Sequence, residues 1–199
     1  MIPILLLPVL ALASPMPLSS RSADLSQKLY LTSLVFGRGW NWEKAEERAG
    51  MIEAAAQRHK VDPALMVAID AYECDLRDRD ASVYAMVHGR RRLVGYDACP
   101  MGMRIMGVGR RARYNAVQLY EMAAADLERS RKVCLGSGHP ARICAERAVA
   151  KRNSRNRDYA AQVFAIAAAL RGQRAPEDHL TRRTVEIVRR LLRIFKKVS

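Results

Sequence analysis

The sequence has 199 residues and is 50% hydrophobic, which suits one globular domain with a sizeable core and excludes a chain that is disordered throughout. Lys and Arg total 34 against 20 Asp and Glu, so the formal net charge is +14 at pH 7. At this charge we expect polyanionic partners, whether nucleic acid, acidic lipid or the anionic polymers of a cell wall.

The first segment of the chain has the features of a secretory signal. Residues 1–13 form an apolar run that ends in Ala11-Leu12-Ala13, the small-x-small pattern that signal peptidase accepts. The run is too short to span a bilayer as a helix. We therefore expect a signal peptide over residues 1–13 and a secreted or periplasmic protein. A linker rich in Ser, Pro and charge is expected over residues 14–28, with the domain beginning near Leu29.

Two helix starts follow in the sequence. Asn41 is placed to cap a helix over residues 42–59, a stretch rich in Ala and Glu. Asp62 and Pro63 then supply the N-cap and the first position of a second helix. The apolar face of this second helix consists of Leu65, Met66 and Ile69, and Glu73 continues the same face at the far end of the helix.

Residues 82–97 predict a short β-hairpin, because apolar residues alternate from Val83 to Val87 and a turn follows at His88-Gly89. Helical periodicity returns downstream in three stretches, which are residues 113–133, 141–152 and 158–170. The expected fold class is therefore mainly α, a helical domain over residues 29–175 with a small β-hairpin.

Residues 176–199 predict a basic amphipathic helix at the end of the chain. Its apolar side chains fall on one side and its Arg and Lys on the other; the apolar set is Val188, Leu191, Leu192, Phe195 and Val198. Two interpretations stay open. The helix either docks on the domain and leaves a solvated charged face, or it adsorbs to a membrane surface or an anionic polymer.

The four cysteines favour two disulfides, because an even count in an oxidising compartment indicates disulfides rather than metal ligation. Cys134 and Cys144 flank a turn-rich loop that can close on itself, which leaves Cys74 to pair with Cys99. No CxxC or HxxxH spacing supports a zinc site. We expect neither a metal nor a cofactor.

Glu73 is the candidate for chemistry. A carboxyl group held against apolar side chains loses hydration, which raises its pKa and lets it keep a proton near neutral pH, as a general acid requires. A purely structural role competes with this interpretation. Glu73 and Arg77 are spaced i, i+4, and an ion pair between them would hold the carboxylate ionised.

Three short motifs, in order within residues 45–170, resemble those of soluble lytic transglycosylases and goose-type lysozymes. The first resembles the family's xDPxLxxAxxxxES helix through Val61-Asp62-Pro63, Leu65, Ala68 and Glu73. The second, CPMGMRIMG, resembles the family's GxMQxM loop through Met103, Ile105, Met106 and Gly107. The third resembles an Asn-containing helix start followed by YxxxV, through Asn153 and Tyr159-Ala160-Ala161-Gln162-Val163.

This resemblance implies a lysozyme-like fold and a single catalytic acid, Glu73, that cleaves the β-1,4 bond between N-acetylmuramic acid and N-acetylglucosamine in peptidoglycan. It also implies a set of substrate-binding residues, which are Met103, Arg104, Met106, Asn153 and Tyr159. A packing role competes for the two methionines and the tyrosine. The aspartates that follow Glu73 are interpreted as solvated loop or cap residues: Asp75, Asp78, Asp80 and Asp97.

Three residues depart from the family's pattern. Cys74 stands at the family's Ser, Arg104 stands at its Gln, and Gly102 lies one residue later than its loop glycine. A Cys74–Cys99 disulfide would tie the catalytic helix to the substrate loop in place of the hydrogen bond that the serine makes. The departures at Arg104 and Gly102 motivate an alternative, a catalytically inactive lysozyme-like protein that binds glycan.

A basic nucleic-acid-binding protein is the third functional class, supported by the net charge and the arginine-rich C-terminus. The expected signal and disulfides argue against it, and the chain has no motif that reads a nucleic-acid groove. The expected partners are therefore peptidoglycan glycan strands, together with anionic wall polymers or a membrane surface for the basic C-terminal helix. We expect no specific nucleic acid.

Overall fold

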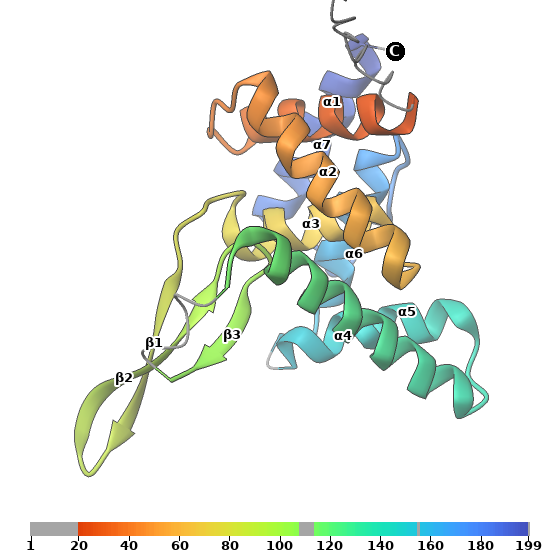
Figure 1. Ribbon diagram of the computed structural model, residues 1–199. Helices are drawn as coiled ribbons and strands as arrows, with labels where there is room; N and C mark the ends of the chain where they lie inside the picture. The colour runs from red at the N-terminus through yellow and green to blue at the C-terminus, as the bar shows by residue number, and fades with distance from the viewer. Residues whose placement is uncertain (1–19, 108–113, 155, 199) are drawn as a thin grey trace, which may run out of the picture.

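The computed structural model describes residues 20–107, 114–154 and 156–198, so the signal expected over residues 1–13 lies outside the described part. The structure is mainly helical with a small antiparallel sheet that projects to one side of the helices (Figure 1). The mainly α class with a small β element is confirmed. The α-helices are α1 (Ser20–Val35), α2 (Trp42–His59), α3 (Pro63–Cys74), α4 (Ala116–Gly136), α5 (Ala141–Ala150), α6 (Tyr159–Leu170) and α7 (Arg182–Val198).

The helix α1 begins before the expected domain boundary at Leu29. Leu25 and Leu29 are both buried in the main core, and α1 packs on α2. The linker expected over residues 14–28 is therefore wrong for its described part, from residue 20 onward. A spacing of i, i+4 places the two leucines on one helical face, and the polar residues around them obscured this stripe in the sequence.

The helix α3 forms the centre of the core. Asp62 accepts a hydrogen bond from the backbone N–H of Ala64 at 2.9 Å, which caps the helix where the sequence predicted it. Every residue from Ala64 to Ala71 is buried, as a helix that is apolar nearly all round requires. The helices α6 and α2 pack on α3. The helix ends at Cys74 because Asp75 adopts a left-handed conformation, with φ of 51°.

The sheet consists of β1 (Ala81–Val87), β2 (Arg90–Ala98) and β3 (Met103–Met106), in that order. The first two strands form the expected hairpin. The third strand was not expected, because four residues are too few to establish an alternating pattern. It pairs antiparallel with β2 and places Arg104 opposite Asp97.

Both expected disulfides are present. Cys74 is bonded to Cys99, which joins the end of α3 to the segment after β2. Cys134 is bonded to Cys144, which joins α4 to α5. Two such bonds are typical of proteins that fold in an oxidising compartment.

The helix α7 packs on the domain through its apolar side. Val188 and Leu191 are buried in the main core, and α7 contacts α6 and α1. The structure therefore shows the docked form of the basic C-terminal helix, with exposed arginines on its outer face. Across the described ranges, no helix is long and apolar enough to cross a membrane.

Candidate active site

A cleft of about 470 Å³ lies where the end of α3, the β2–β3 part of the sheet and the segment after α5 meet. Four of the expected catalytic and substrate-binding residues line it: Glu73, Met103, Arg104 and Asn153. Its described lining also holds three acidic and three basic side chains, which are Glu73, Asp97 and Asp126 with Arg104, Lys151 and Arg152. The cleft is therefore close to electrically balanced, in a molecule whose formal charge is +14.

Glu73 occupies the last turn of α3 and contacts the backbone of Gly102. A Cβ added to Gly102 would lie 2.8 Å from Cβ of Glu73 and 3.1 Å from its Cγ, closer than real side chains approach. Gly102 also has a left-handed φ of 56°, which favours glycine. The shifted loop glycine thus lets the loop close directly on the Glu73 side chain.

Burial raises the pKa of Glu73 above its ordinary value. Tyr159 and the Arg152 guanidinium act in the opposite direction, and the Asp97 carboxylate adds to the rise. Arg77 is not the partner of Glu73, because the helix ends at Cys74 and the Arg77 guanidinium lies 3.8 Å from Asp75 instead. The i, i+4 ion pair that would have held Glu73 ionised is therefore not formed.

Tyr159 lies behind Glu73 at the start of α6 and is fully buried. Burial and the neighbouring Glu73 carboxylate raise the pKa of the Tyr159 phenol, so it stays protonated. Its hydroxyl makes no hydrogen bond of ordinary geometry to a described residue, although it lies close enough to Glu73 to lower the pKa of that carboxyl. Tyr159 therefore lies in the core near Glu73 and does not line the cleft.

Arg152 is a residue of this site that sequence reasoning missed. It lies in the short 3₁₀ segment η2 (Lys151–Asn153), where its guanidinium donates to the carbonyl of Met101 and lies 3.4 Å from the sulfur of Met103. The side chain thus holds the loop that covers Glu73. Nothing local marks it in the sequence, because it is one of 34 basic residues and its partners lie about fifty positions away.

Arg104 forms a two-pronged ion pair with Asp97 across β2 and β3. Its Nε and Nη2 donate to the two carboxylate oxygens at 2.8 and 2.9 Å. The pair keeps Arg104 at the edge of the cleft, where the resemblance led us to expect a glycan contact. Met106, by contrast, is 51% exposed on β3 and does not line the cleft.

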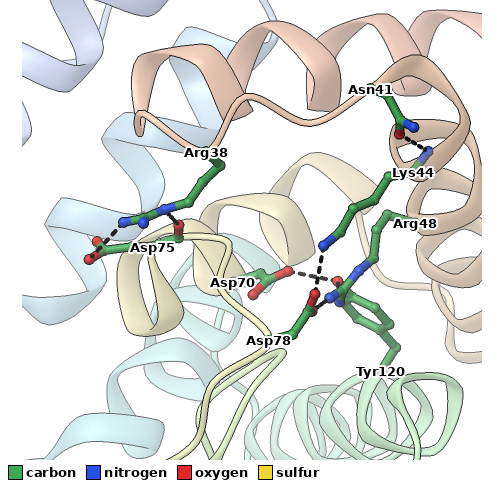
Figure 2. A network of polar contacts seen from close by, with 8 residues as sticks. All are labelled: Arg38, Asn41, Lys44, Arg48, Asp70, Asp75, Asp78 and Tyr120. Atoms are coloured by element: carbon green, nitrogen blue, oxygen red, sulfur yellow. Dashed lines mark hydrogen bonds and ion pairs between the residues drawn. The ribbon is translucent and has the colours of Figure 1, made fainter.

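A network of polar side chains, buried at Asp70 and Tyr120, joins α3 to its neighbours (Figure 2). The Tyr120 hydroxyl donates to Asp70 at 2.6 Å and accepts from Arg48 at 2.8 Å. Arg48 also pairs with Asp78, to which Lys44 donates at 2.7 Å. These contacts join α2, α3 and α4 to the segment that leads into β1.

Asp70 precedes Glu73 by three residues on α3 and is 1% exposed. Burial raises its pKa, while Arg48, Tyr120 and the backbone N–H of Met101 partly oppose the rise. Nothing local in the sequence singles out Asp70, because its partners Arg48 and Tyr120 are 22 and 50 residues distant in the chain. The network fixes α3 beside the loop that covers Glu73.

No protein-family model, curated protein or solved structure matches the chain. Within the part of the chain that the structure describes, no group of three or more His, Cys, Asp or Glu side chains is placed to hold a metal ion.

Proposed function

We propose that the protein is a lytic transglycosylase of lysozyme-like fold that cleaves the β-1,4 bond between N-acetylmuramic acid and N-acetylglucosamine in peptidoglycan. The observation that carries the proposal is the environment of Glu73. Its carboxyl group opens into a cleft, is partly desolvated and has a raised pKa. A carboxylic acid whose pKa is raised in this way binds its proton more tightly than a solvated one, which favours action as a general acid.

Glu73 would first donate its proton to the glycosidic oxygen as the bond to the sugar carbon breaks. The substrate's own acetamido group, followed by its 6-hydroxyl, supplies the electron pair that replaces this bond. The Glu73 carboxylate then takes the proton of the attacking hydroxyl, which restores the acid and yields a 1,6-anhydro sugar. One carboxyl group therefore performs both proton transfers, where most glycosidases use two.

The Asp97–Arg104 pair favours this course over hydrolysis. Hydrolysis with two carboxylates would need a second acidic residue near Glu73. Asp97 lines the same cleft and its charge acts on the pKa of Glu73, so it is the candidate for that role. Both of its oxygens accept hydrogen bonds from Arg104, at 2.8 and 2.9 Å, so it is poorly placed to activate a water molecule.

Digestion of purified peptidoglycan, followed by mass spectrometry of the released fragments, tests the proposal. We expect 1,6-anhydro products from the native protein and a loss of about 10²- to 10⁴-fold in their release with Glu73→Gln. Asp126→Asn is the matched control, because it removes a carboxylate from the same cleft. No release by the folded native protein would reject the enzyme, and hydrolysed products without anhydro sugar would reject the transglycosylase.

The Asp97–Arg104 pair also supports a second candidate, a catalytically inactive protein that binds glycan strands. An arginine engaged by an aspartate occupies the position at which the resemblance places a glycan-binding glutamine. Binding of peptidoglycan without cleavage, equal for the native protein and Glu73→Gln, is the result expected from this alternative.

Secretion and wall binding belong to the same proposal. The two disulfides support folding in an oxidising compartment. The apolar face of α7 is docked, and its outer face presents exposed arginines, among them Arg182, Arg190 and Arg193. Anionic wall polymers are the proposed partners of this outer face. No site specific for nucleic acid is proposed.

A further inference from the structure

The outer part of the β1–β2 hairpin projects away from the helices, at the lower left of Figure 1. No residue of β1 is buried, and neither are the first five residues of β2. A two-stranded ribbon without a covered face is only marginally stable in water. No side chain of residues 81–94 belongs to a hydrophobic core of the described structure.

Each face of the hairpin combines apolar side chains with arginine. Directly paired residues share a face, so Tyr84 and Met86 lie with Leu93 and Arg91. Arg91 stacks on the Tyr84 ring, 4.3 Å from its centroid. The other face carries Ala85, Val87, Arg90 and Arg92.

The charges of this hairpin have one sign. Residues 81–96 contain no Asp or Glu. Within the described chain, Arg90, Arg91 and Arg92 make no ion pair, and all three are exposed. Tyr84 is 48% exposed and Met86 is 69% exposed beside them. An anionic partner would therefore meet Arg91 beside two large uncovered apolar side chains on one face of the hairpin, with Arg90 and Arg92 on the opposite face of the same thin ribbon.

We propose that this hairpin binds the surface of a bilayer that contains anionic lipid. The arginines contact lipid phosphates, while Met86 and Tyr84 enter the boundary between headgroups and acyl chains. A soluble polyanion would engage the arginines but would leave Met86 in water, so the exposed apolar side chains favour lipid. This site is separate from the cleft and from α7, and the inference does not depend on cleavage activity.

Co-sedimentation with vesicles of phosphatidylcholine, with and without phosphatidylglycerol, tests the charge requirement. We expect binding only when phosphatidylglycerol is present and a loss of about a hundredfold for Arg90→Gln/Arg91→Gln/Arg92→Gln, since each arginine near an anionic surface contributes roughly fivefold. The control, Arg182→Gln/Arg190→Gln/Arg193→Gln, removes the same charge from α7. Equal loss in the two variants, or loss in the α7 variant alone, would overturn the proposal.

Tryptophan fluorescence tests insertion separately from charge. Met86→Trp places a reporter on the hairpin, and Val133→Trp places one on α4 at a site of similar exposure, 69% against 68%. We expect phosphatidylglycerol vesicles to shift the emission of the Met86→Trp variant to shorter wavelength and to leave that of the Val133→Trp variant unchanged. Unshifted emission from Met86→Trp, together with arginine-dependent binding to inorganic polyphosphate, would assign the hairpin to a soluble polyanion instead.

Discussion

At the scale of single residues, the contact between Glu73 and Gly102 bears on both the solvation of the Glu73 carboxyl group and its access to the cleft. In the proposed mechanism the Glu73 carboxyl group must be partly shielded from water to hold its proton, yet it must reach the substrate. A glycine provides both, because its backbone covers one side of Glu73 without a side chain that would fill the cleft. The same closeness makes the position intolerant of even a methyl group.

Gly102→Ala should therefore lower the free energy of unfolding more than the same substitution at another glycine with a similar φ. Gly39 has a nearly identical φ, 58° against 56°, but an added Cβ there would meet nothing within 4 Å. We expect Gly39→Ala to lower the free energy of unfolding by about 1 kcal/mol from backbone strain alone, and Gly102→Ala by roughly 2–3 kcal/mol because it also displaces Glu73. Urea unfolding measures both. Equal losses of free energy of unfolding would mean that the loop moves away from Glu73 at no additional cost, which would contradict this prediction.

The pKa of Glu73 links the site to stability. Because burial raises this pKa, the folded protein binds the proton more tightly than the unfolded chain. The resulting stabilisation is complete below the unfolded value, near 4.5, and is lost as the pH rises through the folded pKa. Above the folded pKa the ionised carboxylate is less favourable in the folded protein than in the unfolded chain, so it destabilises the fold.

Glu73→Gln should then be at least as stable as the native protein at pH 7. We expect its advantage in free energy of unfolding to shrink as the pH falls through the folded pKa of Glu73 and to be smallest below about 4.5, because the native carboxyl group is then protonated as well. Urea unfolding at pH 4 and at pH 7 makes the comparison. An advantage that increased towards low pH would contradict the raised pKa.

At the scale of elements, the sequence predicted what depends on local pattern. Residues 82–97 alternate, Asp62-Pro63 begins a helix, and the apolar face of α3 leads to Glu73, so each could be predicted from neighbouring positions. Arg152 and Asp70 could not, because their roles arise from partners brought together by the fold. The strand β3 was too short to show a period, and α1 was hidden by polar residues around its two leucines.

The two disulfides should have similar effects on stability and different effects on activity. They close loops with sequence separations of 25 and 10, so each should contribute about 3 kcal/mol to the free energy of unfolding. Only Cys74–Cys99 joins α3 to the loop over Glu73. We expect Cys74→Ser/Cys99→Ser to lose peptidoglycan cleavage under conditions where Cys134→Ser/Cys144→Ser, still folded, retains it. Equal cleavage activity in the two variants would show that the Cys74–Cys99 disulfide is not needed to position Glu73.

At the scale of the whole molecule, α7 belongs to the domain rather than to a separate tail. Leu191 is completely buried in the main core. The sequence correctly indicated an apolar side for this helix but left open whether the domain or an external surface would cover it. The arginines of the outer face stay exposed, so the same helix contributes both to the core and to the charge of the surface.

Leu191→Ala should therefore destabilise the entire domain. A buried leucine truncated to alanine costs about 2–5 kcal/mol, and we expect thermal unfolding to remain a single transition at a lower midpoint. Val133→Ala, at a position 68% exposed, should change the free energy of unfolding by less than about 0.5 kcal/mol. A separate early transition with an unchanged main one would show that α7 detaches on its own.

The balanced charge of the cleft has a consequence for how the protein would work along a polymer. Attraction to an anionic strand acts on the molecule as a whole, through its net charge of +14, whereas the three acidic and three basic side chains around Glu73 add little net pull. If the proposed function holds, residence on the wall and release of a cleaved end would be governed by different surfaces. The protein would then stay on its polymer between cuts while each product left the cleft.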